Sequence, residues 1–406
     1  MNKKDDVVIV SGVRTPFSKF GSALRDMHSM ELGIIAIKAC LERSGVKGGD
    51  LDELYYGMCI QSEAALNYNV IGRQALLKAG LPENLLSLTV DRACCSSLVS
   101  VQLGYKSIRL GDAEVCMAVG AENMSNTPVV LGGHRFGRGL SPLTMVDHLN
   151  PIQYNGFGIL AKDAGEVAME YGITREMQDE WALKSQQKYQ AAKKAGRFDR
   201  ELTPIEVPQK KGPAKIFVED DFPRADTTIE GLSKLKPVYG SPTVTAGNAP
   251  GLDAGASAVI IMKRARAEAL GIKPLATILS MASMAKEPRR MAEVPGYAIE
   301  LALSRAGLKI DQADVFEINE AFAAMPLVST KIMAGMDEER WTKIKEKTNP
   351  NGGAIAMGHP VGASGARILL TMMYELERRG GGIGACGICG GLAQGDAAVI
   401  RVDESN

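Results

Sequence analysis

The stretch Ala36-Ile37-Lys38-Ala39-Cys40-Leu41-Glu42-Arg43-Ser44-Gly45-Val46-Lys47 decides the predicted fold, because a similar stretch returns late in the chain. The second copy is Ala298-Ile299-Glu300-Leu301-Ala302-Leu303-Ser304-Arg305-Ala306-Gly307-Leu308-Lys309, and six of the twelve positions are identical. Each copy is typical of a helix that ends at a glycine, and an acidic turn and a strand-like run follow it. The alternative is that any two such helices look alike. We predict two similar α/β halves related by duplication.

The surrounding sequence extends this pattern of alternating strands and helices. Short apolar runs at 7–10, 54–58, 87–90 and 115–119 predict strands, the first ended by Ser11-Gly12 and the last by Gly120. Helices are expected at 30–44, 98–110 and 364–379. The region between the halves carries turn residues, charges and one amphipathic helix at 174–195, with Thr174 as its N-cap. We expect this region to cover a site without forming an independent core.

These patterns predict three segments. The N-terminal half takes 1–123 together with 251–272, a loop domain takes 124–250, and the C-terminal half takes 273–406.

Bulk composition excludes several classes of protein. The 406 residues hold 47 basic and 47 acidic side chains, so no basic excess favours binding to nucleic acid or to an anionic membrane. No apolar run reaches the roughly 18 residues that a membrane helix needs. The N-terminus has neither the apolar core of a secretory signal nor the bias of a transit peptide. Seven cysteines in a long chain argue against a disulfide framework, and we expect a cytoplasmic protein with reduced thiols.

The segment Val90-Asp91-Arg92-Ala93-Cys94-Cys95-Ser96-Ser97-Leu98 places Cys94 between a predicted strand and a predicted helix. Free N–H groups and the helix dipole at such a position favour the thiolate, which is the nucleophilic form of cysteine. The alternative is a buried structural cysteine, the commonest state of a free cysteine. This segment alone leaves both interpretations open.

A glycine-dense loop, Asn351-Gly352-Gly353-Ala354-Ile355-Ala356-Met357-Gly358-His359-Pro360-Val361-Gly362-Ala363-Ser364-Gly365-Ala366-Arg367, carries one of only four histidines. Glycines on both sides allow backbone and ligand to approach the imidazole closely. A near-neutral pKa would make His359 a natural partner for a thiolate. A structural histidine in a tight turn is the competing interpretation.

Two further motifs combine polar and reactive groups. Glu317-Ile318-Asn319-Glu320-Ala321-Phe322-Ala323 puts Asn319 at a strand end, where α/β sites gather, although a helix N-cap is an equal alternative. Cys386-Gly387-Ile388-Cys389-Gly390-Gly391-Leu392-Ala393-Gln394-Gly395 has the spacing of a metal or redox pair. Because there is no second cysteine pair at zinc spacing, we expect no metal site.

Together these motifs resemble the thiolase family over nearly the whole chain. The resemblance implies a duplicated αβαβα layered fold with an inserted loop domain. It also implies an acyltransferase that cleaves 3-ketoacyl-CoA with CoA, or condenses acyl-CoA in reverse. CoA is then a substrate, and no cofactor is implied. The segments Val244-Thr245-Ala246-Gly247-Asn248-Ala249 and Asp221-Phe222-Pro223-Arg224-Ala225-Asp226-Thr227-Thr228 look like the end of the family's loop domain and its CoA-binding stretch.

The resemblance also implies a role for each candidate residue. Cys94 matches the acylated nucleophile, His359 the residue that activates it, and Cys389 the group that moves the proton at the substrate α-carbon. Asn319 matches the asparagine that holds a water in the oxyanion hole shared with His359. The backbone N–H groups of Cys94 and Gly391 match the second oxyanion hole. The remaining matches are CoA contacts, at Arg224, Phe322 and Ala249.

Several positions depart from the family's common pattern. Cys95 and Ser97 stand where glycines are frequent, and 160–166 differs from the family's segment over the acyl pocket. We therefore expect a bulky, branched or aromatic acyl group in place of acetoacetyl, and some thiolases for aromatic acids need a small partner chain. Rival interpretations are a non-catalytic acyl-CoA-binding subunit and a thiol-redox protein. A homodimer or homotetramer is expected, with 131–139 as an oligomerisation loop or as a surface loop without a partner.

Overall fold

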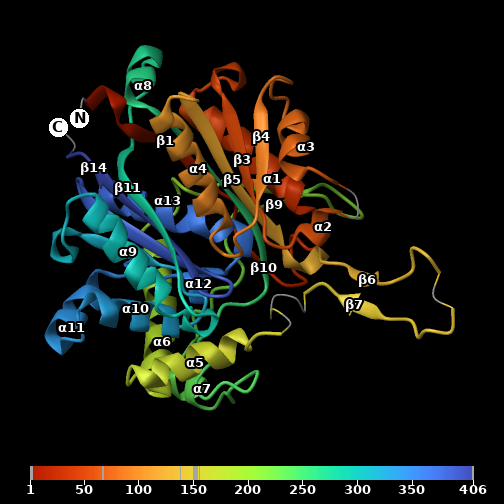
Figure 1. Ribbon diagram of the computed structural model, residues 1–406, viewed down its shortest axis with the longest axis vertical. Coiled ribbons are helices and arrows are strands. Elements are labelled where there is room, and N and C mark those ends of the chain that lie inside the picture. The colour runs from red at the N-terminus through yellow and green to blue at the C-terminus, as the bar shows by residue number, and fades with distance from the viewer. Residues whose placement is uncertain (1–2, 66–67, 138, 150–153, 155, 405–406) are drawn as a thin grey trace.

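The computed structural model describes residues 3–65, 68–137, 139–149, 154 and 156–404, and its centre is one mixed sheet that runs through both halves of the chain (Figure 1). Nine strands form a continuous path, and the short strand β2, Ser18–Lys19, pairs with β10 beside it. The order across the sheet is β12 (Val315–Ile318), β13 (Gly382–Gly390), β14 (Gln394–Val402), β11 (Ala276–Ala285), β1 (Val7–Arg14), β10 (Asp253–Lys263), β5 (Val115–Asn123), β3 (Glu53–Gly57) and β4 (Leu86–Val90).

The pairing pattern confirms two similar halves. In the first half β3 runs parallel to β5, β5 antiparallel to β10, and β10 antiparallel to β1. In the second half β12 runs parallel to β13, β13 antiparallel to β14, and β14 antiparallel to β11. β1 and β11 then pair antiparallel and join the halves.

Thirteen α-helices are described, and they lie between the strands along the chain. Their bounds are α1 Ser29–Ser44, α2 Gln61–Ala65, α3 Ile71–Lys78, α4 Ser96–Leu110, α5 Leu160–Glu170, α6 Arg175–Lys194, α7 Ile229–Ser233, α8 Arg264–Leu270, α9 Val294–Arg305, α10 Ala324–Met333, α11 Glu338–Lys347, α12 Ala354–Met357 and α13 Ser364–Arg378. None of these described helices is long and apolar enough to cross a membrane.

Alternation along the strands separates the core into layers. On β5, Met117 and Val119 pack with α1 on the outer face, whereas Cys116 and Ala118 pack with α4 and α13 on the inner face. α4 and α13 contact each other between the two half-sheets, and α9 packs on the outer face of the second half. The layers are therefore helix, sheet, helix, sheet, helix, as the predicted fold class requires.

Local signals placed most helix ends correctly. Gly45 has φ 71° and caps α1, and the Thr174 side chain accepts a hydrogen bond from the backbone of Met177 at the start of α6.

Two predicted strand ends were wrong. β1 continues past Ser11 through a register shift to Arg14, and β5 continues through Gly120 to Asn123. Both strands continue because β10 supplies backbone partners for each of them beyond the glycine.

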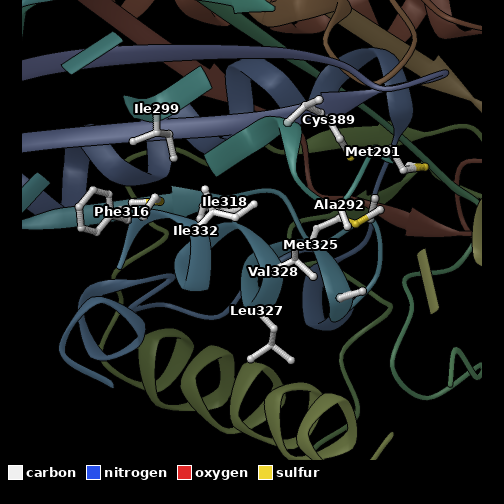
Figure 2. Close-up of a cluster of buried hydrophobic side chains, with 14 of the residues drawn as sticks. Met291, Ala292, Ile299, Phe316, Ile318, Met325, Leu327, Val328, Ile332 and Cys389 are labelled. Carbon is white, nitrogen blue, oxygen red and sulfur yellow. The ribbon is translucent and has the colours of Figure 1, made fainter. Parts of the chain in front are cut away.

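The region between the halves shares the core of the second half. Apolar side chains of α5 and α6, among them Val167 and Trp181, belong to the same buried cluster as α9 and α10. Figure 2 shows part of this cluster, with Leu327 of α10 directed toward α6 and Cys389 near its edge. Two small hairpins complete the region, β6 (Val129–Leu131) with β7 (Met145–Asp147) and β8 (Ile205–Val207) with β9 (Lys215–Phe217).

A buried ion cluster ties this region to the first half. The guanidinium of Arg14 is fully buried and lies 2.6 Å from Glu201 Oε1 and 2.7 Å from Asp220 Oδ1. Tyr189 donates to Asp220, and Thr371 of α13 donates to Glu201. Because each charged group has several hydrogen bonds, the cluster holds all three parts of the chain together.

Candidate active site

Cys94 lies in the turn between β4 and α4. The preceding Ala93 has φ 47°, a left-handed conformation that is uncommon for a residue with a side chain. Asp91 Oδ1 accepts the Ala93 N–H at 2.8 Å, and the Ser96 hydroxyl donates to the Ala93 carbonyl at 2.7 Å. These bonds hold the strained turn that sets the direction of Cys94. No local sequence pattern predicted this turn.

Gly120 allows three segments to meet beneath this turn. A Cβ atom at Gly120 would lie 2.3 Å from the Gly362 carbonyl oxygen and 2.4 Å from Ser97 Cβ. The absence of a side chain therefore lets β5, α4 and the histidine loop approach one another closely.

His359 lies within reach of the Cys94 sulfur. Its Nε2 is 3.3 Å from Cys94 Sγ, and its Nδ1 is 2.6 Å from Ser364 Oγ. The Ser364 hydroxyl donates to the Pro360 carbonyl at 2.8 Å, so its oxygen accepts from Nδ1–H. The imidazole therefore carries its proton on Nδ1 and presents the Nε2 lone pair to the thiol.

The backbone of His359 is fixed from the other side. Its N–H donates to Asp253 Oδ2 at 2.6 Å, and Gly358 before it has φ 107°. Asp253 is fully buried, and burial raises the pKa of its carboxyl group to about 7.

Asn319 and Cys389 complete the cluster predicted from the motifs. Asn319 Nδ2 is 3.4 Å from His359 Nε2, and its backbone N–H donates to Gly387 of β13. Asn319 precedes no helix directly, since α10 begins at Ala324, so the alternative of an N-cap is wrong. Cys389 is buried near the end of β13, and its charge is one cause of the raised pKa of Cys94.

The turn after Cys389 packs against the nucleophile loop. A Cβ at Gly390 would lie 2.9 Å from the Arg92 carbonyl and 3.1 Å from Cys95 Sγ. A Cβ at Gly391 would lie 1.7 Å from the Tyr154 hydroxyl, so Tyr154 borders this turn directly. Gly391 and the Cys94 loop, which the resemblance assigned to one oxyanion hole, are thus in adjacent, contacting segments.

Burial sets the protonation of the Cys94–His359 pair. Burial, followed by the nearby charge of Cys389, raises the pKa of the Cys94 thiol well above its usual value. Burial, followed by the positive charge of Arg367, lowers the pKa of His359 to about 3. These shifts run against the predicted thiolate at the helix N-terminus and against a near-neutral histidine. In the free protein, burial favours a neutral thiol beside a neutral imidazole.

Two of the three predicted CoA contacts lie in one cavity. Arg224 and Ala249 line a cavity of about 240 Å³ between α6 and α7, together with Gln186, Phe222 and Thr228. Phe322 instead packs, half-buried, against the core of the second half. The following residue, Ala323, donates its N–H to the Asn248 carbonyl at 2.9 Å, which keeps this segment next to Ala249.

The comparisons with known proteins agree with this arrangement. A family model described as "Thiolase, N-terminal domain" matches residues 7–265, and one described as "Thiolase, C-terminal domain" matches residues 272–402. The chain belongs to the thiolase family. This thiolase is accordingly an acyltransferase that cleaves 3-ketoacyl-CoA thioesters with CoA or forms them by the reverse condensation.

Relatives of this thiolase match over nearly their whole lengths. An acetyl-CoA acetyltransferase of Cupriavidus necator is 44% identical, over 98% of this chain and 99% of that protein. A beta-ketoadipyl-CoA thiolase of Acinetobacter baylyi is 40% identical, over 97% and 98%. The crystal structure of human mitochondrial 3-ketoacyl-CoA thiolase in complex with CoA matches with a TM-score of 0.90 and 36% identity, over 98% of each chain.

The cysteines of the thiolase form neither a disulfide nor a group of metal ligands in the described residues. All seven cysteines are free. Cys386 and Cys389 are three residues apart on β13, so their side chains point to opposite faces and belong to different buried clusters. Among described residues, no three His, Cys, Asp or Glu side chains are grouped to hold a metal ion.

Sequence reasoning missed several groups of the site. Ser364 stands within the quoted histidine motif, five residues after His359, and its place at the predicted helix start was the only signal for it. Tyr154 and Cys59 reach the site from loops without a recognisable pattern. α5 packs its apolar face on the core of the second half, whereas other segments line the space beside Cys94.

Proposed function

We propose that acyl transfer in this thiolase proceeds through a thioester on Cys94, with His359 as the base that accepts the thiol proton. The observation that carries this proposal is the 3.3 Å contact between His359 Nε2 and Cys94 Sγ, with Nδ1 bound to Ser364. Because the free pair is neutral, proton transfer accompanies the attack of the sulfur on the substrate. The buried site thus avoids holding a separated charge pair before substrate binds.

Cleavage begins at the 3-keto carbon of the substrate. Cys94 sulfur bonds to the 3-keto carbon, its proton passes to His359, and the bond between carbons 2 and 3 breaks. The electron pair leaves as the enolate of a shorter acyl-CoA, which takes a proton from Cys389. The thiol of a second CoA then gives its proton to Cys389 and attacks the acyl carbon on Cys94. The new acyl-CoA is released as the Cys94 sulfur leaves and takes back the proton held by His359. The condensation reverses each step.

Two sets of donors would stabilise the oxyanions of these steps. We assign one set to His359 and Asn319, whose nitrogens are 3.4 Å apart, with a water held by Asn319. We assign the other to the backbone N–H groups of Cys94 and Gly391. A donor of this kind contributes about 3–4 kcal/mol to lowering a barrier.

We assign CoA to the cavity bordered by Arg224 and Ala249. A guanidinium beside an open cavity is suited to the phosphates and adenine of CoA, because it offers several donors and a planar face. Phe322, next to the segment that carries Asn248, is assigned to the pantetheine arm. No cofactor takes part in the proposed reaction, since the two thiols and the imidazole supply its chemistry.

Mass spectrometry of the intact protein after incubation with acetyl-CoA tests the proposal. We expect one acetyl adduct, on Cys94, which is lost in Cys94→Ala. In Cys389→Ala the adduct should still form, but thiolysis of acetoacetyl-CoA should be lost because the enolate has no proton donor. Cys386→Ala is the matched control, since this buried thiol lies on the opposite face of the same strand. An unmodified wild-type protein would refute the proposal.

The space beside the nucleophile favours an acyl group larger than acetoacetyl. A cavity of about 510 Å³ adjoins Ala93 and Gly391, and its wall includes Arg92, His148 and Tyr154. Apolar side chains pack closer to Cys94, namely Ile60, Met124, Leu149 and Val361. We therefore propose an acyl chain with an apolar stem and a polar or aromatic end. Equal kcat/KM for acetoacetyl-CoA and longer 3-ketoacyl-CoA substrates would contradict it.

We also propose that the protein is a homo-oligomer that joins at β4. This strand ends the sheet, and Leu86 and Leu88 on it are 68% and 51% exposed. The β6–β7 hairpin projects from the body (Figure 1) and exposes Phe136, Leu140 and Met145, which supports a second contact between copies. The predicted oligomerisation loop 131–139 forms part of this hairpin, except that Arg138 lies outside the described residues.

Sedimentation velocity tests the oligomer. We expect a dimer or tetramer for the wild type and a smaller species for Leu88→Lys. Leu301→Lys, an exposed leucine on α9, serves as the control and should leave the assembly unchanged. A monomeric wild type would rule out the proposal.

A further inference from the structure

A buried arginine lies directly behind Asn319. Arg367 of α13 is fully buried, and its Nη2 donates to Asn319 Oδ1 at 3.2 Å. A guanidinium has only donors, so the amide oxygen of Asn319 must face it. The amide nitrogen is consequently turned toward His359, with Nδ2 3.4 Å from Nε2.

The same guanidinium faces Glu317, which is buried as well. Arg367 Nη1 and Glu317 Oε2 are 3.6 Å apart, beyond hydrogen-bonding distance. Within the described residues, Nε and Nη1 of Arg367 and both carboxyl oxygens of Glu317 lack hydrogen-bond partners. A buried pair with such poor geometry repays little of its desolvation cost, so stability does not explain it.

We propose that Arg367 is a positioning residue for the thiolase reaction: it holds the Asn319 amide nitrogen toward the active site and places its positive charge behind the Asn319–His359 pair. This inference rests on the proposed roles of Cys94 and His359. It adds a residue that touches neither sulfur nor substrate and acts through the two side chains that do.

The charge of Arg367 is only partly cancelled by its neighbour. Burial raises the pKa of Glu317 to about 8 even though the adjacent guanidinium opposes the shift. Glu201 and Glu320 are further acidic neighbours of Arg367, yet its positive charge is still one cause of the lowered pKa of His359. This charge opposes protonation of His359, whose pKa burial has already lowered to about 3.

Other titratable groups lie on the elements around His359 and its loop, and the test leaves them unchanged. They are Cys94 before α4, Asp253 on β10, whose carboxylate accepts the His359 N–H, Glu122 on β5, which accepts the Gly362 N–H, and Cys389 on β13. Variants at Arg367 and Glu317 therefore change the charge on only one side of His359.

Steady-state thiolysis of acetoacetyl-CoA across pH, with Arg367→Gln, Arg367→Lys and Glu317→Gln, tests the inference. For R367Q we expect kcat to fall about 10- to 100-fold with KM little changed, because the Asn319 amide loses its orientation. The acidic limb of the kcat/KM profile should move up by about one pH unit, because His359 gains a proton more readily.

The other two variants separate orientation from charge. R367K keeps the charge, so its acidic limb should match the wild type while kcat lies between wild type and R367Q. E317Q keeps the Arg367–Asn319 bond, so its kcat should exceed that of R367K and its acidic limb should not move up. An unmoved limb in R367Q, or an upward shift in E317Q equal to that in R367Q, would overturn the inference.

Two checks keep this result distinct from other failures. If R367Q is not recovered folded, the comparison of R367K with E317Q decides, and a kcat in R367K equal to or above that in E317Q overturns the inference. Failure of the proposed function would appear in the wild type, as no acetyl adduct on Cys94. Normal acylation of the wild type with an unmoved R367Q profile would overturn only the role of Arg367.

Discussion

The hydrogen bond between Ser364 and His359 gives the sharpest test of the catalytic geometry. Ser364→Ala removes the acceptor of Nδ1–H, at 2.6 Å, and leaves this buried donor unpaired. Leaving such a group unsatisfied costs about 1–3 kcal/mol, and the alternative tautomer would put the proton on Nε2, where it faces Cys94. Either outcome raises the barrier for proton transfer by that order. We therefore expect kcat to fall about 10- to 100-fold.

The assay is thiolysis of acetoacetyl-CoA by ultraviolet absorbance, with kcat and KM measured separately. KM should change little, because Ser364 lies behind the imidazole. Ser257→Ala is the matched control, since this buried hydroxyl donates to the Ala363 carbonyl at 2.7 Å in the same loop without contacting His359. Both variants lose a buried hydrogen bond, so both should melt at a lower temperature. An equal fall in kcat in the two variants would refute the tautomer argument.

Three further variants probe the scaffold. Arg14→Gln breaks the buried ion cluster and should lower the free energy of unfolding in urea by about 3–5 kcal/mol, and a loss under 1 kcal/mol would contradict the role given to the cluster. Asp253 has a pKa of about 7 in the fold, above its unfolded value of 3.8, so the folded state binds the extra proton and loses stability as pH rises. From pH 5 to 7 the wild type should lose about 2 kcal/mol relative to Asp253→Asn, and parallel pH curves would oppose this. Gly120→Ala should cost about 1–3 kcal/mol in thermal denaturation because its Cβ meets backbone, whereas Gly49→Ala, with open space around it, should not.

Much of the fold follows from local sequence, and particular elements show why. The helix at Ser29–Ser44 and the helix at Arg175–Lys194 carry their own end signals, so their bounds depend on neighbouring residues alone. β1 and β5 ran past their glycines because strand length depends on partners in the sheet. That partner is β10, which comes more than 100 residues later in the chain, and no local pattern contains it.

The site divides in the same way. The residue types and motifs marked Cys94, His359, Asn319 and Cys389 before any distance was known. Their protonation could not be obtained in that way, because burial raises the pKa of Cys94 and lowers that of His359, and burial depends on segments from both halves. These shifts run against the predicted thiolate. Phe322 also matches the family's pattern. Only the tertiary structure shows that it packs against the core of the second half and does not line the cavity that Arg224 borders.

The amino-acid sequence by itself determined the duplicated architecture and the family. Helix caps, strand runs and reactive motifs are each formed by residues that lie close together in the sequence, so they can be read without the structure. The tertiary structure alone decided which atom of His359 faces the sulfur, which way the Asn319 amide points and how Arg367 and Ser364 stand behind them. These features depend on distances of a few ångströms between residues up to 265 positions apart. Hydrogen bonding and desolvation act over such distances in space, and spacing along the chain does not report them.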